Sequence, residues 1–243
     1  MSKRLKFFLS HLTISFLIAL LAVGVVFFVW YPAPLAKAVG VTHIFLMMLI
    51  IDVIVGPILG FLVYKQGKKN LKFDLSVIIL LQICAFGYGI YSIADGRPVW
   101  LVYSVDRIEL IRNNDIQQQP HVKIKPQYQH PSWTSQQYVA VQLSKNHEQK
   151  QNDMFNAIFG LTLAQQPDRY VPYLQSKSDI QKNAQSLEIL KQFNDKKQLK
   201  AILAQYPQAN AFVPLKAGHV DMTVLLDKNT GEVIKIVDLR PWR

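Results

Sequence analysis

The chain has 243 residues, half of them hydrophobic, and a formal net charge of +11 at pH 7. Residues 1–94 carry eight Lys or Arg against two Asp, so over half of the positive excess lies in the most apolar part of the chain. The other basic residues are spread along residues 95–243 without a dense block, which argues against a nucleic-acid partner. A single cysteine, Cys84, excludes a framework of disulfides.

Three apolar runs follow one another near the N-terminus, at about residues 7–30, 41–64 and 75–94. A hydrocarbon core of roughly 30 Å needs about 20 helical residues at about 1.5 Å each, and each run reaches that length. A buried helix of a soluble protein is the alternative for one such run, but three in succession are typical of membrane spans. We therefore expect residues 1–94 to form a transmembrane region of three helices.

The distribution of basic residues predicts the orientation of these spans. Three basic residues precede the first run and four lysines separate the second from the third, whereas the loop after the first run holds only Lys37. Because Lys and Arg stay on the cytoplasmic side, we expect the N-terminus in the cytoplasm and residues 95–243 on the outer side of the membrane, which is the periplasm if the membrane is the inner membrane of a Gram-negative bacterium. A cleaved signal peptide is the alternative for the first run, but its 24 residues exceed the usual ~7 to 15 apolar residues.

The second apolar run carries one formally charged side chain, Asp52, near its centre. A carboxylate at mid-bilayer costs roughly 2.5 to 3.5 kcal/mol on insertion scales, so it normally faces protein or a wet cavity. Asp52, Gly56 and Gly60 are spaced by four and share one helix face, on which the two glycines let another helix approach closely. Pro57 removes a backbone donor and is expected to kink the helix. The polar candidates near the acid come from the third run: Gln82, Cys84 and Tyr88.

Three roles remain open for Asp52. A protonated Asp52 that is hydrogen-bonded to the third run would hold the three helices together. Alternatively, the face that it shares with the glycines would meet a helix of another protein. A proton relay is the third possibility, although a single acid without a series of partners makes a poor pathway for protons.

The outer part begins with strand patterns. Alternating apolar residues predict a strand over about residues 97–111 and another over 138–143. Residues 112–137 contain three prolines and predict a long connection with at most a short strand. Since the helix patterns that follow lie between strands at both ends, we expect residues 95–243 to form a small periplasmic α+β domain.

The second half of this domain is expected to contain helices and a closing hairpin. A helix is expected over residues 146–160, capped by Asn146. Its apolar face consists of four side chains: Met154, Phe155, Ile158 and Phe159. Ser178 followed by Gln181 resembles a capping box that opens a further apolar helix. Two alternating runs on either side of residues 227–231 predict a β-hairpin.

Sequence motifs of common enzymes and cofactor sites are absent. The chain has no Gly-rich phosphate loop, no paired cysteines at metal-ligand spacing and no HExxH. His219 and Asp221 could place two metal ligands on one strand face, but a lone pair of this kind is more often surface polarity. No motif of a nucleophilic serine is present either. The sequence therefore predicts a protein that is not an enzyme, without catalytic residues, cofactor or metal.

Several segments resemble the TfpX/TfpZ type IV pilin accessory proteins, a family that includes the FimB-type fimbrial accessory proteins. The matching stretches, after a basic start, are IDVIVGPILGFLVYKQGKK (51–69), DGRPVWLVYSVDRIELI (95–111), PDRYVPY (167–173) and the closing residues 212–242. The resemblance covers nearly the whole chain apart from about residues 112–137. It implies N-terminal membrane spans, a periplasmic C-terminal part and no established catalytic residues.

The resemblance also implies a role in the assembly or dynamics of a cognate pilus. We expect a non-enzymatic inner-membrane accessory protein for type IV pilus biogenesis, whose partners are the type IV major pilin, other pilus assembly components and the lipid bilayer, with no nucleic acid. A small membrane sensor with a periplasmic ligand-binding domain is the alternative, although its cytoplasmic loops are too short for an output domain. A membrane enzyme that modifies pilin is a third possibility, against which the missing motifs weigh.

Overall fold

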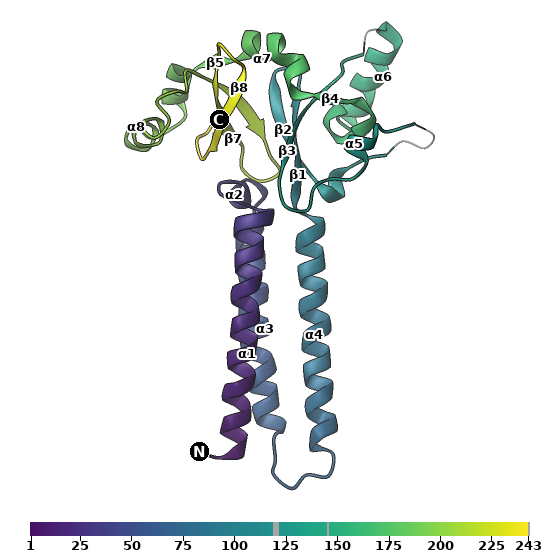
Figure 1. The fold of residues 1–243 in the computed structure, drawn as a ribbon, viewed down its shortest axis with the longest axis vertical. Helices are drawn as coiled ribbons and strands as arrows, with labels where there is room; N and C mark the ends of the chain where they lie inside the picture. Colours follow the sequence, from purple (N-terminus) through teal and green to yellow (C-terminus); the bar gives the residue numbers. More distant parts are fainter. Residues whose placement is uncertain (119–121, 145, 243) are drawn as a thin grey trace. The chain divides into compact units, whose positions relative to one another are not determined.

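The computed structural model describes residues 1–118, 122–144 and 146–242. It divides into two compact units, one of Met1–Ala36 with Gly40–Gly96 and the other of Lys37–Val39 with Arg97–Arg243. Helices alone build the first unit, and a mixed sheet with short helices builds the second (Figure 1).

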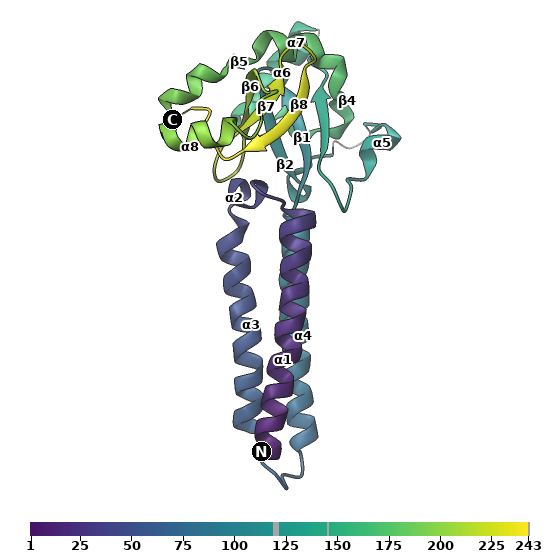
Figure 2. The ribbon, with the colours of Figure 1, turned by 60° about the vertical axis from the view of Figure 1, so that its left-hand side comes forward.

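Three long helices make up the first unit: α1 (Lys3–Val25), which continues into a π-helical turn η1 (Val26–Trp30), α3 (Val41–Val63) and α4 (Leu71–Asp95). Figures 1 and 2 show them side by side, and α3 packs against both of the others. Each is long and apolar enough to cross a membrane by length and composition. The expected class, three transmembrane helices followed by an α+β part, is confirmed.

The long helices α1 and α4 begin four residues before the corresponding apolar runs. At α1, Ser2 caps the added turn, because its hydroxyl accepts a hydrogen bond from the Leu5 backbone N–H at 3.3 Å. At α4, the added turn contains Lys72 and Asp74. Charged residues fit the end of a spanning helix well, so the helices extend past the runs that hydropathy marks.

One mixed sheet forms the frame of the second unit. Its strands are β1 (Pro98–Ser104), β2 (Arg107–Arg112), β3 (Gln137–Val141), β4 (Tyr170–Pro172), β5 (Gln185–Ser186), β6 (Ala211–Lys216), β7 (Met222–Asp227) and β8 (Glu232–Val237). The order is β4-β3-β1-β2-β6-β7-β8, with β5 beside β6. The pairs β1/β3 and β2/β6 are parallel, whereas the others are antiparallel.

Short helices fill the connections of the second unit. They are α2 (Leu35–Val39, shared with the first unit), η2 (Asn113–Asp115), α5 (Pro126–Gln129), α6 (His147–Ile158), η3 (Leu163–Gln165), η4 (Pro167–Arg169), η5 (Tyr173–Ser176), α7 (Lys177–Asn183), η6 (Leu187–Gln192) and α8 (Lys196–Leu203). No strand occurs between β2 and β3 in the part of this segment that the structure describes. The optional short strand expected over residues 112–137 is therefore not seen there.

Two hydrophobic clusters hold the second unit together. The first surrounds Trp100 of β1, which contacts Tyr128 and Tyr170 edge to face at ring-centre distances of 6.0 and 5.4 Å. The second lies around Phe212 and Leu225 beneath η6 and α8. Every residue of β1 is buried, so both faces of the sheet are covered at this central strand.

The strand expected over residues 97–111 is wrong as a single element, because the chain turns back at Val105. This β-branched residue has a φ of 59°, and the Asp106 N–H donates to the Ser104 carbonyl at 2.8 Å. Such a backbone costs about 1 to 3 kcal/mol and normally calls for Gly or Asn. Asn183 supports the turn from α7, since its amide donates to the Val105 carbonyl at 2.8 Å.

The capping box expected at Ser178 is wrong as well. Ser178 lies inside α7, and Gln181 instead donates to the Lys228 and Asn229 carbonyls of the closing hairpin at 2.9 and 2.7 Å. After α7 the chain does not continue as a helix, because Gln185 pairs with Phe212 in the sheet. This pairing with a distant strand outweighs the local helix pattern.

The closing hairpin and the helix after Asn146 are confirmed. The strands β7 and β8 pair around a turn in which Gly231 has a φ of 74°, and the Asp227 carboxylate accepts from the Asn229 N–H at 2.9 Å. Asn146 caps α6 by accepting from the Glu148 N–H at 3.2 Å. The apolar face of α6, however, is exposed, and it is Asp153 that faces the body of the unit, where it pairs with Arg169 at 3.3 Å.

Candidate functional site

A polar cluster of His11, Ser15, Asp52 and Gln82 lies among the three long helices. The Gln82 side-chain amide of α4 donates to the Ser15 hydroxyl of α1 at 3.1 Å and to the Asp52 backbone carbonyl of α3 at 2.8 Å. Its oxygen lies 2.9 Å from His11 Nε2 of α1. One side chain therefore joins all three helices.

The hydrogen bonds of Gln82 define the proton position on His11. Because an amide oxygen can only accept, His11 Nε2 is the donor in its contact with Gln82 Oε1. His11 Nδ1 is buried and has no hydrogen-bond partner among the described residues. In apolar surroundings, hydrogen bonds between helices contribute about 0.6 to 1.7 kcal/mol each. The polar cluster thus adds to packing of the three helices.

The two glycines of α3 face side chains of this same chain. A Cβ added at Gly56 would lie 1.9 Å from Gln82 Oε1, and one added at Gly60 would lie 2.9 Å from Phe7 of α1. Pro57 between them is buried, and α3 is helical on both sides of it. The space beside the glycines is therefore filled by α1 and α4.

The other residues expected near Asp52 lie in different places. Asp52 Oδ2 is buried and has no hydrogen-bond partner among the described residues, because Gln82 bonds to the backbone carbonyl instead of the carboxylate. Cys84 and Tyr88 are exposed on the surface of α4. Of the three candidates on the third run, the structure brings only Gln82 to Asp52 by a hydrogen bond within the part of the chain that it describes.

Sequence reasoning missed His11 and Ser15 of the first run. A signal was available, since Ser15, Ala19 and Ala22 are the small residues at helical spacing on α1 and all are buried. His11 precedes Ser15 by one turn and lies on the same side. A polar residue that extends a stripe of small residues within a membrane span indicates the face turned to a neighbouring helix.

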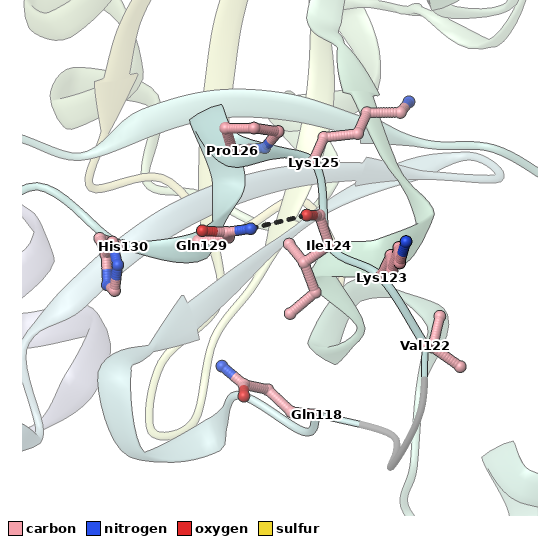
Figure 3. A pocket seen from close by; sticks show the side chains of 8 residues that line it. All are labelled: Gln118, Val122, Lys123, Ile124, Lys125, Pro126, Gln129 and His130. Carbon is pink, nitrogen blue, oxygen red and sulfur yellow. Dashed lines mark hydrogen bonds between the residues drawn. The ribbon is translucent and has the colours of Figure 1, made fainter.

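A surface hollow of about 810 Å³ lies in the second unit around α5 (Figure 3). It is lined by Gln118, Val122, Lys123, Ile124, Lys125, Pro126, Gln129 and His130. Gln129 donates to the Ile124 carbonyl at 2.9 Å, as the dashed line in Figure 3 shows, and Lys125 donates to the Tyr170 carbonyl at 3.1 Å. These two polar side chains thus hold the fold, and we assign no chemistry to the hollow.

The pair of His219 and Asp221 does not form a metal site in the described structure. Asp221 accepts from the Ala217 N–H at 2.8 Å and from the Trp242 indole at 2.7 Å. Its carboxylate therefore connects the segment before β7 to Trp242. Among the residues that the structure describes, no three His, Cys, Asp or Glu side chains gather in a way that could hold a metal ion.

Glu109 of β2 is an acid of the second unit that is partly buried, and its burial changes its pKa. It stands opposite Lys216 of β6 in the parallel pairing. Burial raises the pKa of Glu109, and the positive charge of Lys216 opposes this effect without cancelling it. The ionised form of Glu109 is therefore less favourable in the folded protein than in the unfolded chain.

We expect Glu109→Gln to change how stability depends on pH. The unfolded pKa is about 4.3 and the folded one is higher, so the folded state binds the proton more tightly. The free energy of unfolding of the wild type should then fall as pH rises from about 4.3 through the folded pKa and level off above it. Urea unfolding of both proteins in nanodiscs across this range measures the difference. The difference in the free energy of unfolding should grow in favour of Glu109→Gln as pH rises. Parallel stability curves of the two proteins would contradict the raised pKa of Glu109.

Known proteins resemble this chain over both of its units. The first 40 residues match the family model described as "Fimbrial assembly protein FimB". The fimbrial assembly proteins of serogroups I and E1 of Dichelobacter nodosus are each 33% identical to this chain over 228 residues, covering 90% of it and 89% of theirs. The protein of serogroups C1 and C2 is 40% identical over 108 residues, 44% of this chain and 82% of its own length. No solved structure matches.

Proposed function

Because the chain belongs to the family of FimB fimbrial assembly proteins, we propose that it is a membrane-bound accessory protein of fimbrial biogenesis. The observation that carries the proposal is the 33% identity to fimbrial assembly proteins over 90% of the chain. Three helices that can cross a membrane fit this role, since they would keep the second unit at the membrane where fimbriae are built.

The finer proposal concerns topology and partner. The N-terminus would lie in the cytoplasm and the second unit in the periplasm, because basic residues flank the N-terminal ends of α1 and α4. The partner would be the cognate type IV major pilin, in line with the resemblance to pilin accessory proteins. The protein would then influence the assembly, the stability or the extension and retraction of the fimbria by contact with pilin.

The proposal includes no catalytic step. The polar cluster in the membrane serves packing, since Gln82 joins α1, α3 and α4 by hydrogen bonds. For Asp52, Gly56, Pro57 and Gly60 we propose a role in packing within this chain, because Gln82 and Phe7 fill the space beside the glycines. A partner would therefore bind to another surface of the helices.

Deletion of the gene tests the proposed function. We expect surface pilin, sheared from the cells, to fall to a small fraction of the wild-type amount and to return when the gene is restored. The measurement compares sheared pilin with total cellular pilin, with and without the retraction motor. Loss only when the motor is present would assign the protein to opposing retraction, and loss in both strains would assign it to assembly. Unchanged surface pilin in both strains would refute the proposal.

A further inference from the structure

A groove runs between α1 and α4 on the surface of the first unit. Both helices pack against α3, and two adjoining hollows of about 380 and 320 Å³ lie between them. Ile18 and Phe86 line both hollows, so the two are continuous. We call this the α1/α4 groove; its lining extends from His11 of α1 to Trp30 at the end of η1, and from Ile79 to Ile90 on α4.

The α1 wall of the groove matches the thickness of a bilayer, whereas the α4 wall is shorter. Nineteen residue steps separate His11 from Trp30 on the α1 wall, which at about 1.5 Å per residue is about 28 Å, close to the roughly 30 Å of a hydrocarbon core. Eleven steps separate Ile79 from Ile90 on the α4 wall, which is about 17 Å. A lipid acyl chain belongs to one leaflet and would cover about half of the α1 wall. A polypeptide inside the hydrocarbon must satisfy its own backbone hydrogen bonds, so a peptide occupant would be an α-helix.

The wall of the groove is apolar except at one depth. There His11, Ser15 and Gln82 line it, and Ser15 accepts from Gln82 while its own hydroxyl proton has no acceptor among the described residues. An acyl chain offers no acceptor for that proton. A helix that carries a carboxyl, amide or hydroxyl group at the depth of Ser15 does offer one, and it would gain a hydrogen bond between helices.

We infer that the α1/α4 groove binds one transmembrane helix of a partner protein, apolar along its length and with one hydrogen-bond acceptor at the depth of Ser15. This inference rests on the proposed function and deepens it, because it names the segment of the fimbrial subunit that would be bound. The groove differs from the glycine face of α3, which α1 and α4 already cover.

A photo-crosslinking residue placed in the groove tests the inference. Ile83 is 62% exposed and lines the groove, whereas Leu81 on the same helix is 64% exposed and does not line it. Ile18 and Leu20 make a second such pair on α1. In cells that assemble fimbriae, Ile18 and Ile83 should capture the transmembrane segment of the fimbrial subunit, identified as a cross-linked peptide by mass spectrometry. Leu20 and Leu81 should capture lipid.

The outcomes separate this inference from the proposed function. Lipid alone at all four positions, or equal capture at matched positions, would overturn the groove as a binding site. If deletion still removed surface fimbriae, the proposed function would stand without it. Capture of an identified transmembrane segment of a different membrane protein at Ile18 and Ile83 would support the groove and would replace pilin as the proposed partner.

The hydrogen bond at Ser15 has a test of its own. Ser15→Ala removes the donor together with the acceptor of the Gln82 amide, whereas Ser15→Thr keeps a hydroxyl at the same depth. We expect cross-linking from Ile83 to fall about tenfold in Ser15→Ala if the bond contributes about 1.4 kcal/mol, and to recover in Ser15→Thr. Protein level and helix content serve as controls for folding. Equal yields in a folded Ser15→Ala protein would refute the acceptor on the partner helix.

Discussion

Gly56→Leu is expected to disrupt the polar cluster and to destabilise the three-helix unit, whereas Gly87→Leu should leave both intact. At Gly56 the new Cβ would lie 1.9 Å from Gln82 Oε1 and 2.4 Å from its Cδ, but at Gly87 it would meet nothing within 4 Å. Gln82 cannot swing away without losing its bonds to Ser15, His11 and Asp52. At about 0.6 to 1.7 kcal/mol each, these bonds alone predict a loss of about 2 to 5 kcal/mol.

This loss of stability is measured by unfolding the full protein in nanodiscs with detergent while the circular dichroism of its helices is monitored. Gly89→Ala is an informative intermediate, since its added Cβ would approach Met48 Sδ at 2.1 Å, the far part of a flexible side chain. We expect Met48 to move and the cost to be small. If Gly56→Leu unfolded like Gly87→Leu, Gln82 would not be held between the helices as the structure has it.

The depth of the polar cluster could be predicted from the sequence only after the helix ends were known. A count of twelve residues from the cytoplasmic ends of the apolar runs sets Asp52 level with Ala19 and Gly87, about one turn from its observed neighbours Ser15 and Gln82. Counting from the helix ends corrects this. Ser15 lies 12 residues after Lys3, Gln82 lies 11 after Leu71, and Asp52 lies 11 before Val63. Hydropathy omits the charged first turns of α1 and α4, so depths counted from it are displaced by a turn.

Turns in the second unit show which local signals suffice. The hairpin at Asp227–Gly231 was predictable, because Gly231 takes a positive φ without strain and Asp227 bonds to the turn itself. The turn at Val105 was not predictable. Its strained backbone is held by Asn183, which is 78 residues further along the chain. No pattern within a short window of sequence could contain that support.

The helix α6 shows that periodicity predicts an apolar face but not what covers it. The four large apolar side chains predicted on one side of α6 are all exposed. The opposite side is attached to the unit through Asp153, which pairs with Arg169 and accepts from the Ser144 hydroxyl at 2.5 Å. Because an ion pair with a distant arginine fixes the helix, its orientation was not readable from the helix sequence.

Trp100→Ala is expected to unfold the second unit in a large fraction of molecules. Trp100 is 1% exposed at the centre of the first hydrophobic cluster, where Tyr128 and Tyr170 meet its ring edge to face. Replacing a buried Trp by Ala costs about 3 to 5 kcal/mol, a large part of the 5 to roughly 15 kcal/mol that stabilises a typical domain. Limited proteolysis of the full protein in nanodiscs should then cut within residues 97–242, while the membrane helices stay protected.

Trp133→Ala supplies the matched control for the same measurement. Trp133 is 63% exposed and is covered on one face by the Arg97 guanidinium, 4.0 Å from the ring centre. A contact of this kind contributes about 0.5 to 1 kcal/mol at an exposed site, so proteolysis should stay close to that of the wild type. Equal cleavage of both variants would mean that Trp100 does not hold the cluster. If Trp100→Ala alone also lost surface fimbriae at normal membrane levels, the folded second unit, and not only the three helices, would be required for the proposed function.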